Sequence, residues 1–284
     1  MTRRAPGPRV VPAAAPARVR DRLAAASGPV PVVHRGLHAL YLRLDDLCVG
    51  VTAAGATSVP CALRVASPDL GPLAAVRSAR VADGVLHLDD SAVVVRRLVD
   101  VSVPRLDPAP LRQVPLARGA ADVVGAVAAE LPAPALRLLA AGDPAAVLLL
   151  VGRGSGLTPL GDDVLAGWLA LHRASGAAAP AVEDAVVRHL GRTTLLSATL
   201  LDCALRGEVL PQYAAVVRAL PGHLAGTGRP ALQAAVTDLV RVGHTSGAGL
   251  LLGLRTAIDH LTNQHTSPLT SPRSLVPSHG GHAA

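Results

Sequence analysis

The sequence of 284 residues has no lysine and no phenylalanine, one tryptophan and two tyrosines. Without lysine, the chain cannot form a side-chain Schiff base or supply the lysine of a phosphate-binding P-loop. Aromatic residues make up 1% of the chain, so a surface on which nucleic-acid bases stack is not expected. These absences exclude two kinds of enzyme chemistry and argue against nucleic acid as a partner.

The chain also lacks long apolar runs. The longest is PAAVLLLVG, residues 144–152, whereas a membrane-spanning helix needs roughly 18 apolar residues. The basic start has no continuous apolar segment of the kind found in signal peptides. Three cysteines without metal-ligand spacing do not form a disulfide framework, and Cys48 and Cys61 are predicted to be buried thiols. We therefore expect a cytoplasmic protein with no membrane partner.

Positive charge is concentrated at the beginning of the chain. The formal net charge is +7 at pH 7, and residues 1–35 hold seven arginines against one acid, Asp21. The remainder is therefore close to neutral. A basic segment rich in proline and alanine is typical of a frayed terminus, and residues 1–27 are predicted to be a disordered leader.

The rest of the chain shows two periodicities. Up to about residue 103, short β-type runs alternate with turn residues, and Asp83-Gly84 is a hairpin signal. Three prolines in residues 104–114 mark a boundary, after which alanine-rich helical periodicity begins. We predict an α+β fold with a small N-terminal antiparallel β sheet or barrel and a larger all-α C-terminal domain. The predicted boundaries are 28–104 for the β-rich domain, 115–262 for the helical domain and 263–284 for a disordered tail.

The stretch GRGSGLTPLGDD, residues 152–163, is a candidate ligand loop. Thr158 and Pro159 indicate a helix start, with threonine as the N-cap and proline in the first helical position. A glycine-rich loop that opens a helix favours anion binding, because free N–H groups converge there. Asp162 and Asp163 suggest either a site for Mg²⁺ or Mn²⁺, or a base. The structural alternative is a glycine turn, a threonine cap and acids that complement the helix dipole.

Two further stretches have polar residues beside apolar helical runs. GHTSGAG, residues 243–249, again opens an apolar helix, and two such loops make a shared pocket more plausible. GRTTLLSATLLDCALRGE, residues 191–208, places Arg192, Thr194 and Ser197 at the start of a helix. These residues either line a site or bond to the backbone of their own helix.

The order of these motifs resembles one family. GxGxGLTPxGDDxLxG spans Gly152–Gly167, TxxSxxxLxxAxxG spans Thr194–Gly207, and GHTSG spans Gly243–Gly247. Over about 145–258 the chain resembles the AllH-like family, which includes a subunit of bacterial oxamate carbamoyltransferase encoded with allantoin-degradation genes. Many relatives have serine at the position of Leu160.

The resemblance implies a component of a carbamoyltransferase in purine or allantoin-linked nitrogen metabolism. Such a system forms oxamate and carbamoyl phosphate reversibly from oxalurate and phosphate, and it needs several subunits. The expected partners are a small carboxylate or phosphate ligand and further subunits, including an acyl-CoA-synthetase-like one. Two alternatives stay open: a non-catalytic subunit that binds a small carboxylate or acts as a scaffold, and a metal-dependent hydrolase of amide or ureido bonds.

We expect the two glycine-rich loops to face each other around one ligand. Asp162 and Asp163 would hold the divalent ion or orient an amide nitrogen, and His244 would transfer a proton because its ordinary pKa lies nearest neutrality. Arg192 would bind a planar oxyanion. The candidate ligand-binding residues are Gly154, Gly156, Thr158, Gly161, Arg192, Thr194, Ser197, Thr245, Ser246 and Gly247.

Overall fold

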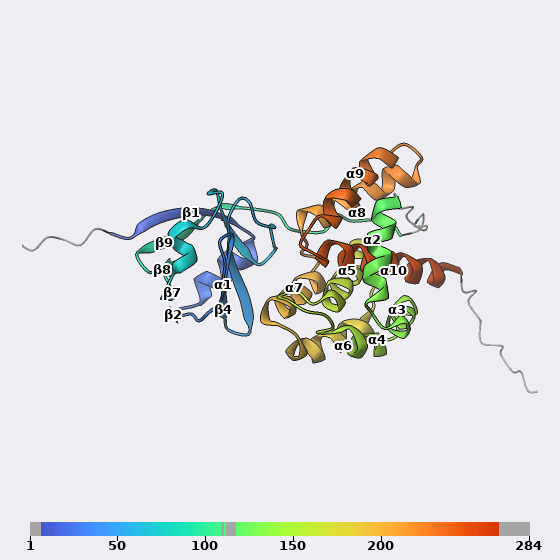
Figure 1. Cartoon of the computed structure of the whole chain (residues 1–284), viewed down its shortest axis with the longest axis horizontal. Coiled ribbons are helices and arrows are strands. Elements are labelled where there is room, and N and C mark those ends of the chain that lie inside the picture. Colours follow the sequence, from blue (N-terminus) through green and yellow to red (C-terminus); the bar gives the residue numbers. More distant parts are fainter. Residues whose placement is uncertain (1–6, 109–110, 112–117, 267–284) are drawn as a thin grey trace, which may run out of the picture.

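The computed structural model describes residues 7–108, 111 and 118–266. The strands of the described chain lie within residues 9–98 and form a β-sheet part. Helices from residue 118 onward form a separate helical part beside it (Figure 1). The predicted α+β fold is confirmed.

The described strands form one nine-stranded sheet in the order β2-β7-β8-β9-β1-β6-β5-β4-β3. The two ends of this order, β2 (Gly28–Pro29) and β3 (Val32–Arg35), are consecutive in the chain. The two residues between them bond to both ends: the Val30 N–H donates to the Ala79 carbonyl, and the Pro31 carbonyl accepts from the Arg43 N–H, each at 2.9 Å. The sheet therefore curls until its two ends meet at one segment. The other strands are β1 (Arg9–Ala15), β4 (Ala39–Leu44), β5 (Leu47–Thr52), β6 (Ala62–Val65), β7 (Ala79–Ala82), β8 (Val85–Leu88) and β9 (Ser91–Leu98).

The sheet is mixed rather than purely antiparallel as expected. Strand β1 runs parallel to β9, and β5 runs parallel to β6. Neither pair is joined by a tight hairpin turn, which is the feature that would enforce antiparallel pairing. The chain between β5 and β6, residues 53–61, forms a longer connection.

Much of the expected disordered leader is ordered. Residues 9–25 form β1, which lies between β9 and β6, and helix α1 (Ala17–Ala25). Arg18 of α1 is half-buried and forms ion pairs with Asp202 at 2.5 Å and Glu208 at 3.0 Å. The sequence of this segment, rich in proline and alanine, did not predict β1 and α1, because their packing partners lie far along the chain. Residues 1–6 of the predicted leader lie outside the described residues.

The helical part is built around α5 (Leu160–Ser175), which is buried over nearly its whole length. Helix α10 (Ser246–Thr266) packs along it (Figure 1). A Cβ on Gly167 would lie 2.2 Å from the Leu250 carbonyl oxygen, and one on Gly253 would lie 2.0 Å from that of Val164. The two helix backbones therefore approach so closely that only glycine fits at the crossing.

The remaining helices surround this pair. Helix α10 includes residues 263–266 of the predicted tail, and residues 267–284 lie outside the described residues. Among the described residues, no single helix is long and apolar enough to cross a membrane. The helices Ala120–Ala129 and Ala133–Ala140 are long and apolar enough only when taken together, and the chain bends by 111° between them. The other bounds are α2 (Arg118–Ala129), α3 (Ala133–Ala140), α4 (Ala145–Leu150), α6 (Pro180–His189), α7 (Leu195–Leu205), α8 (Pro211–Leu224) and α9 (Arg229–Val240), with 3-10 turns η1 (Gly71–Ala75) and η2 (Leu190–Arg192).

Direct contacts join the two parts. The Cys48 N–H in β5 donates to the Thr199 hydroxyl in α7 at 2.8 Å. Cys48, Cys61 and Cys203 are buried free thiols that share one small apolar cluster at this junction. The prediction of buried thiols at Cys48 and Cys61 is confirmed, and the junction is a fixed feature of the fold.

Candidate functional site

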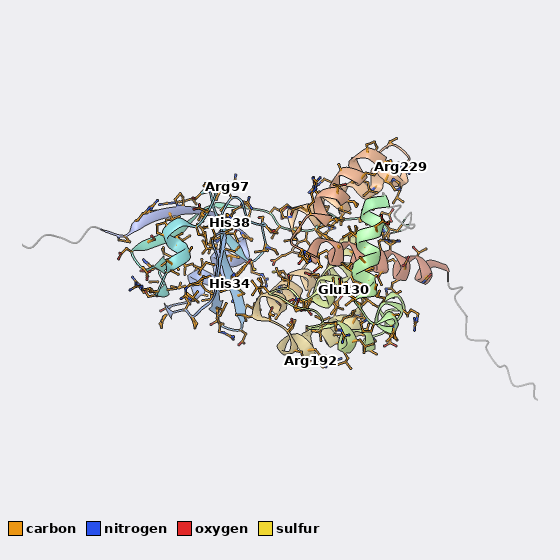
Figure 2. The ribbon with its side chains drawn as sticks, viewed as in Figure 1. His34, His38, Arg97, Glu130, Arg192 and Arg229 are labelled. Carbon is orange, nitrogen blue, oxygen red and sulfur yellow. The ribbon has the colours of Figure 1, made fainter. Side chains whose placement is uncertain are left out.

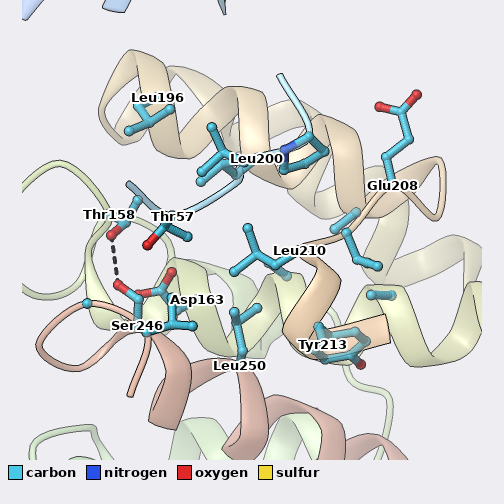
Figure 3. Close-up of a pocket in the computed structure, with 18 of the residues that line it drawn as sticks. Thr57, Thr158, Asp163, Leu196, Leu200, Glu208, Leu210, Tyr213, Ser246 and Leu250 are labelled. Carbon is cyan, nitrogen blue, oxygen red and sulfur yellow. Dashed lines mark hydrogen bonds between the residues drawn. The ribbon is translucent and has the colours of Figure 1, made fainter. Parts of the chain in front are cut away.

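A cavity of about 220 Å³ lies at the junction of the two parts (Figure 3). Most of its wall is aliphatic and comes from α5, α7, α8, α10 and the segments next to them, for example Leu200 and Leu250. Among the described residues, no arginine or histidine lines it. Figure 3 shows hydroxyl and carboxyl groups gathered at one end of the cavity, those of Thr57, Thr158, Asp163 and Ser246.

The two glycine-rich loops meet at this polar end. The hydroxyl oxygens of Thr158 and Ser246 lie 3.0 Å apart and share a hydrogen bond (Figure 3). Thr158 belongs to the loop before α5, and Ser246 begins α10. The loops therefore face each other, as the sequence predicted. Thr158 is not the N-cap of α5, however: that position is Pro159, and no side chain caps this helix.

Asp162 is bonded on both carboxylate oxygens. Its Oδ1 accepts the Gly152 N–H at 2.7 Å. Its Oδ2 accepts the hydroxyls of Thr193 and Ser197, the latter at 2.7 Å. Burial raises the pKa of Asp162, and these three donors oppose the rise. Asp162 thus ties the loop to the segment that enters α7, and it is absent from the described cavity wall.

Asp163 has the opposite surroundings, although it is the next residue. It is 6% exposed, lines the cavity, and its Oδ2 has no hydrogen-bond partner in the described chain. Burial raises the pKa of Asp163 well above its ordinary value, and the Asp162 charge raises it further, while a hydrogen bond with Ser246 opposes the rise. Burial therefore favours the protonated form of the Asp163 carboxyl, which faces the cavity.

Several glycines of the two loops allow close backbone packing. A Cβ would lie 2.5 Å from the Arg192 carbonyl oxygen at Gly152, 2.7 Å from the Leu160 nitrogen at Gly154 and 1.8 Å from the Leu239 carbonyl oxygen at Gly247. Gly152 and Gly154 also have positive φ angles, of 70° and 119°. Gly156, with φ of 84°, has open space around it and is needed only for its turn.

Two of the amides at the start of α5 are hydrogen-bonded within the protein. The Gly161 N–H donates to the Arg153 carbonyl at 2.8 Å, and the Asp162 N–H donates to the Pro159 carbonyl at 3.0 Å. A Cβ on Gly161 would lie 2.0 Å from the Leu150 carbonyl oxygen. The Gly161 and Asp162 amides are therefore occupied within the protein, and anion binding by the rest of this loop stays a prediction.

Several predicted site residues lie away from the cavity wall. His244 and Arg192 are exposed, and Figure 2 shows Arg192 at the edge of the helical part. Thr194 caps α7 by accepting the Ser197 N–H, and its hydroxyl donates to the Leu157 carbonyl at 2.5 Å. The remaining predicted residues outside the described wall are Gly154, Gly156, Gly161, Asp162, Ser197, Thr245 and Gly247, and Leu160 is a buried core residue.

The cavity has polar residues that the sequence reasoning missed. Thr57 comes from the β5–β6 connection, Glu208 follows α7, and Tyr213 lies in α8. The Tyr213 hydroxyl donates to the Gly167 carbonyl at 2.5 Å. No local pattern marks Thr57, because only the docking of the sheet brings it to the loops. The sequence Arg206-Gly207-Glu208 predicted only the end of a helix.

The two aspartates do not make a fitting divalent-cation site. Within the described chain, no group of three His, Cys, Asp or Glu side chains could hold a metal ion. Both oxygens of Asp162 accept from protein donors, and burial favours the protonated, non-ligating form of Asp163. The donor set therefore does not fit Mg²⁺ or Mn²⁺, which prefer ionised oxygen ligands.

The fold and the cavity define a class of protein: an α+β chain that encloses a small, mostly aliphatic cavity between a curled sheet and a glycine-packed helix pair. The family model described as oxamate carbamoyltransferase subunit AllH matches residues 150–258, which include both loops and the helices between them. Over this segment the chain is similar to the AllH family. No curated protein and no solved structure matches the chain.

The match supports a general role as a subunit in a carbamoyltransferase system, and a family of subunits suggests partner proteins in a complex. All three polar groups that the helical part contributes to the end of the cavity, Thr158, Asp163 and Ser246, lie within the matched segment. Thr57 lies outside it.

Proposed function

We propose that this chain is the AllH-like subunit of an oxamate-type carbamoyltransferase and that its cavity binds the uncharged carbamoyl or ureido group of the substrate. The observation that carries the proposal is the buried Asp163 carboxyl, whose Oδ2 has no protein partner and which lines the cavity. Such an atom destabilises the protein unless a ligand or water satisfies it.

A protonated carboxyl is complementary to a carbamoyl group. It offers one O–H donor and one carbonyl acceptor. A carbamoyl group offers one carbonyl acceptor and an N–H donor in the same arrangement, so two hydrogen bonds can form side by side. The hydroxyls of Thr158 and Ser246, 3.0 Å apart, adjoin this carboxyl and can bind the remaining amide N–H or carbonyl lone pair.

The charged part of the substrate must be bound elsewhere. A phosphate or carboxylate placed in this cavity would lose its water without gaining a cationic partner, because no arginine or histidine lines the described wall. Carbamoyl transfer between oxalurate and phosphate moves one carbamoyl group from nitrogen to a phosphate oxygen and releases oxamate. In this proposal Asp163 positions the neutral group, and partner subunits complete the site.

The test compares two substitutions of Asp163 in the assembled system with its partner subunits. Asp163→Asn keeps one donor and one acceptor, so we expect transfer activity within a few-fold of the original chain. Asp163→Ala removes both and should raise the KM for the carbamoyl donor about tenfold or more. Asp184→Asn, on the exposed face of α6, is the matched control and should change nothing.

A non-catalytic scaffold is the second candidate, because His244 and Arg192, the expected proton donor and oxyanion ligand, are exposed away from the cavity. In that case Asp163→Ala would leave kcat and KM unchanged and would alter only assembly with partners. If Asp163→Asn abolished transfer as fully as Asp163→Ala, the carboxylate would instead act as a base, and the proposal of a neutral carboxyl would be wrong.

A further inference from the structure

A second cavity, of about 530 Å³, lies beside the first. The β5–β6 connection separates the two: Thr57 lines the first cavity, Ser58 lines the second, and Val59 lines both. The start of α8 also lies between the two cavities: Leu210 lines the first cavity, and Gln212 lines the second. The second cavity therefore adjoins the described site and shares only Val59 with its described wall.

One row of residues across four strands forms the floor of the second cavity. Thr52 of β5 pairs with Arg64 of β6, Arg64 pairs with Ala14 of β1, and Ala14 pairs with Arg97 of β9. Residues directly opposite each other in a sheet project from the same face. All four line the cavity, and the small Ala14 leaves room between the two arginines.

A β-bulge brings Arg97 into this row. Ala13 pairs with Val95, but Ala14 pairs with Arg97, so that Arg96 is skipped. By simple alternation Arg97 would share the face of Val93 and Val95, which pack into the core of the sheet. The extra residue turns Arg97 to the opposite face, and bulges commonly re-aim a side chain in this way next to binding sites. Figure 2 shows Arg97 on the sheet part.

The second cavity carries uncompensated positive charge. Within the described residues, neither Arg64 nor Arg97 forms an ion pair; Arg64 instead donates to the carbonyls of Ala54 at 2.7 Å and Ala56 at 3.3 Å. The first turn of the fourteen-residue helix α8 also lines the wall, so the positive end of its dipole adjoins the cavity. One acid, Asp100, lies on the wall, and its carboxylate accepts the Ser102 N–H at 2.9 Å.

Two unpartnered buried atoms on the same wall point to a ligand. The hydroxyl oxygen of Thr52, a residue that is 1% exposed, has no hydrogen-bond partner in the described chain, and neither does Oε1 of Gln212. A protein gains nothing in stability from burying such groups alone. A hydroxyl beside two guanidinium groups that form no ion pair in the described chain suits an oxyanion, because each can donate to it.

We propose that the second cavity binds a small molecule through its carboxylate or phosphate group. Arg97 and Arg64 bind the oxyanion with their planar donor arrays, and the Thr52 and Ser58 hydroxyls donate to its remaining oxygens. This assignment does not rest on the proposed carbamoyl site, since none of these four side chains lines the first cavity.

The experiment is calorimetric titration of the full chain with inorganic phosphate and, separately, with oxalate, at an ionic strength held constant with sodium chloride. We expect saturable binding of at least one anion, and the tighter of the two identifies the oxyanion. Arg97→Gln should weaken that binding about tenfold or more, because it removes a charge-assisted hydrogen bond. Arg96→Gln removes the same charge from the neighbouring residue, outside the cavity wall, and should leave the affinity unchanged.

The Thr52→Val variant provides a second, independent test. Because the hydroxyl has no protein partner, the variant should fold with an unchanged or higher Tm and yet bind the anion several-fold more weakly. The proposal is overturned if neither anion binds, or if Arg97→Gln and Arg96→Gln bind equally well. Asp163→Ala should bind the anion like the original chain, so failure at the carbamoyl site and failure here are distinguishable.

Discussion

The two cavities on either side of the β5–β6 connection differ in charge, although they share Val59. The first is mostly aliphatic and has a buried carboxyl with an unpartnered oxygen at its polar end, within the described chain. The second has two arginines without ion pairs in the described chain. The fold thus places a mostly aliphatic cavity next to a cavity lined by two arginines.

The cavities also differ in origin. Most of the wall of the first comes from the segment that matches the AllH family model, residues 150–258. That segment contributes only Pro211 and Gln212 to the described wall of the second, whose two arginines come from strands β6 and β9. Changes in the helical part should therefore affect the first cavity, and changes in the strands should affect the second.

The largest expected effect is that of Asp162→Ala. It leaves the Gly152 N–H and the hydroxyls of Thr193 and Ser197 without their acceptor, so we expect a loss of about 3 kcal/mol in the free energy of unfolding, measured by urea denaturation. Because the loop before α5 forms part of the first cavity wall, that cavity should be disrupted while anion binding in the second persists. A loss below about 1 kcal/mol would show that Asp162 is not the anchor of this loop.

Gly253→Ala should have the next largest effect. The added methyl would lie 2.0 Å from the Val164 carbonyl oxygen, so α5 and α10 must separate, at a cost of about 2 kcal/mol by thermal or urea unfolding. Gly125→Ala in α2 is the matched control: nothing lies within 4 Å of the new methyl, and an exposed helical glycine replaced by alanine should be neutral or stabilising. Equal effects at both positions would contradict the close crossing of α5 and α10.

The smallest effect is the pH dependence contributed by Asp163. A carboxyl whose pKa is raised on folding stabilises the folded state at low pH, and this contribution is lost as pH rises from the ordinary value of about 4 through the raised value. Asp163→Asn removes this titration, so its Tm should exceed that of the original chain by more at pH 8 than at pH 5. Asp162 is present in both proteins, so it enters the difference only through its charge coupling to Asp163. A constant difference across this range would mean that Asp163 is not desolvated.

Local sequence signals predicted a good part of this structure. The change from β to helical periodicity predicted the α+β order of the two parts, and the two glycine-rich loops were predicted to meet. Other features escaped prediction because they depend on distant pairing. Strand β1 is short and rich in alanine, and its order comes from β9 and β6. Arg97 reaches the second cavity only because a register shift against β1 turns its side chain over.

Asp162 and Asp163 show which features the sequence predicts and which depend on tertiary contacts. The sequence by itself determined that two adjacent carboxyls stand at the start of a helix, in a loop whose glycines permit close backbone approach. Only the tertiary structure decided that three donors surround Asp162 while Asp163 keeps a free oxygen in a cavity. The physical reason is that consecutive residues of a helix point in different directions, so each is desolvated and bonded by whatever distant segment packs against its side.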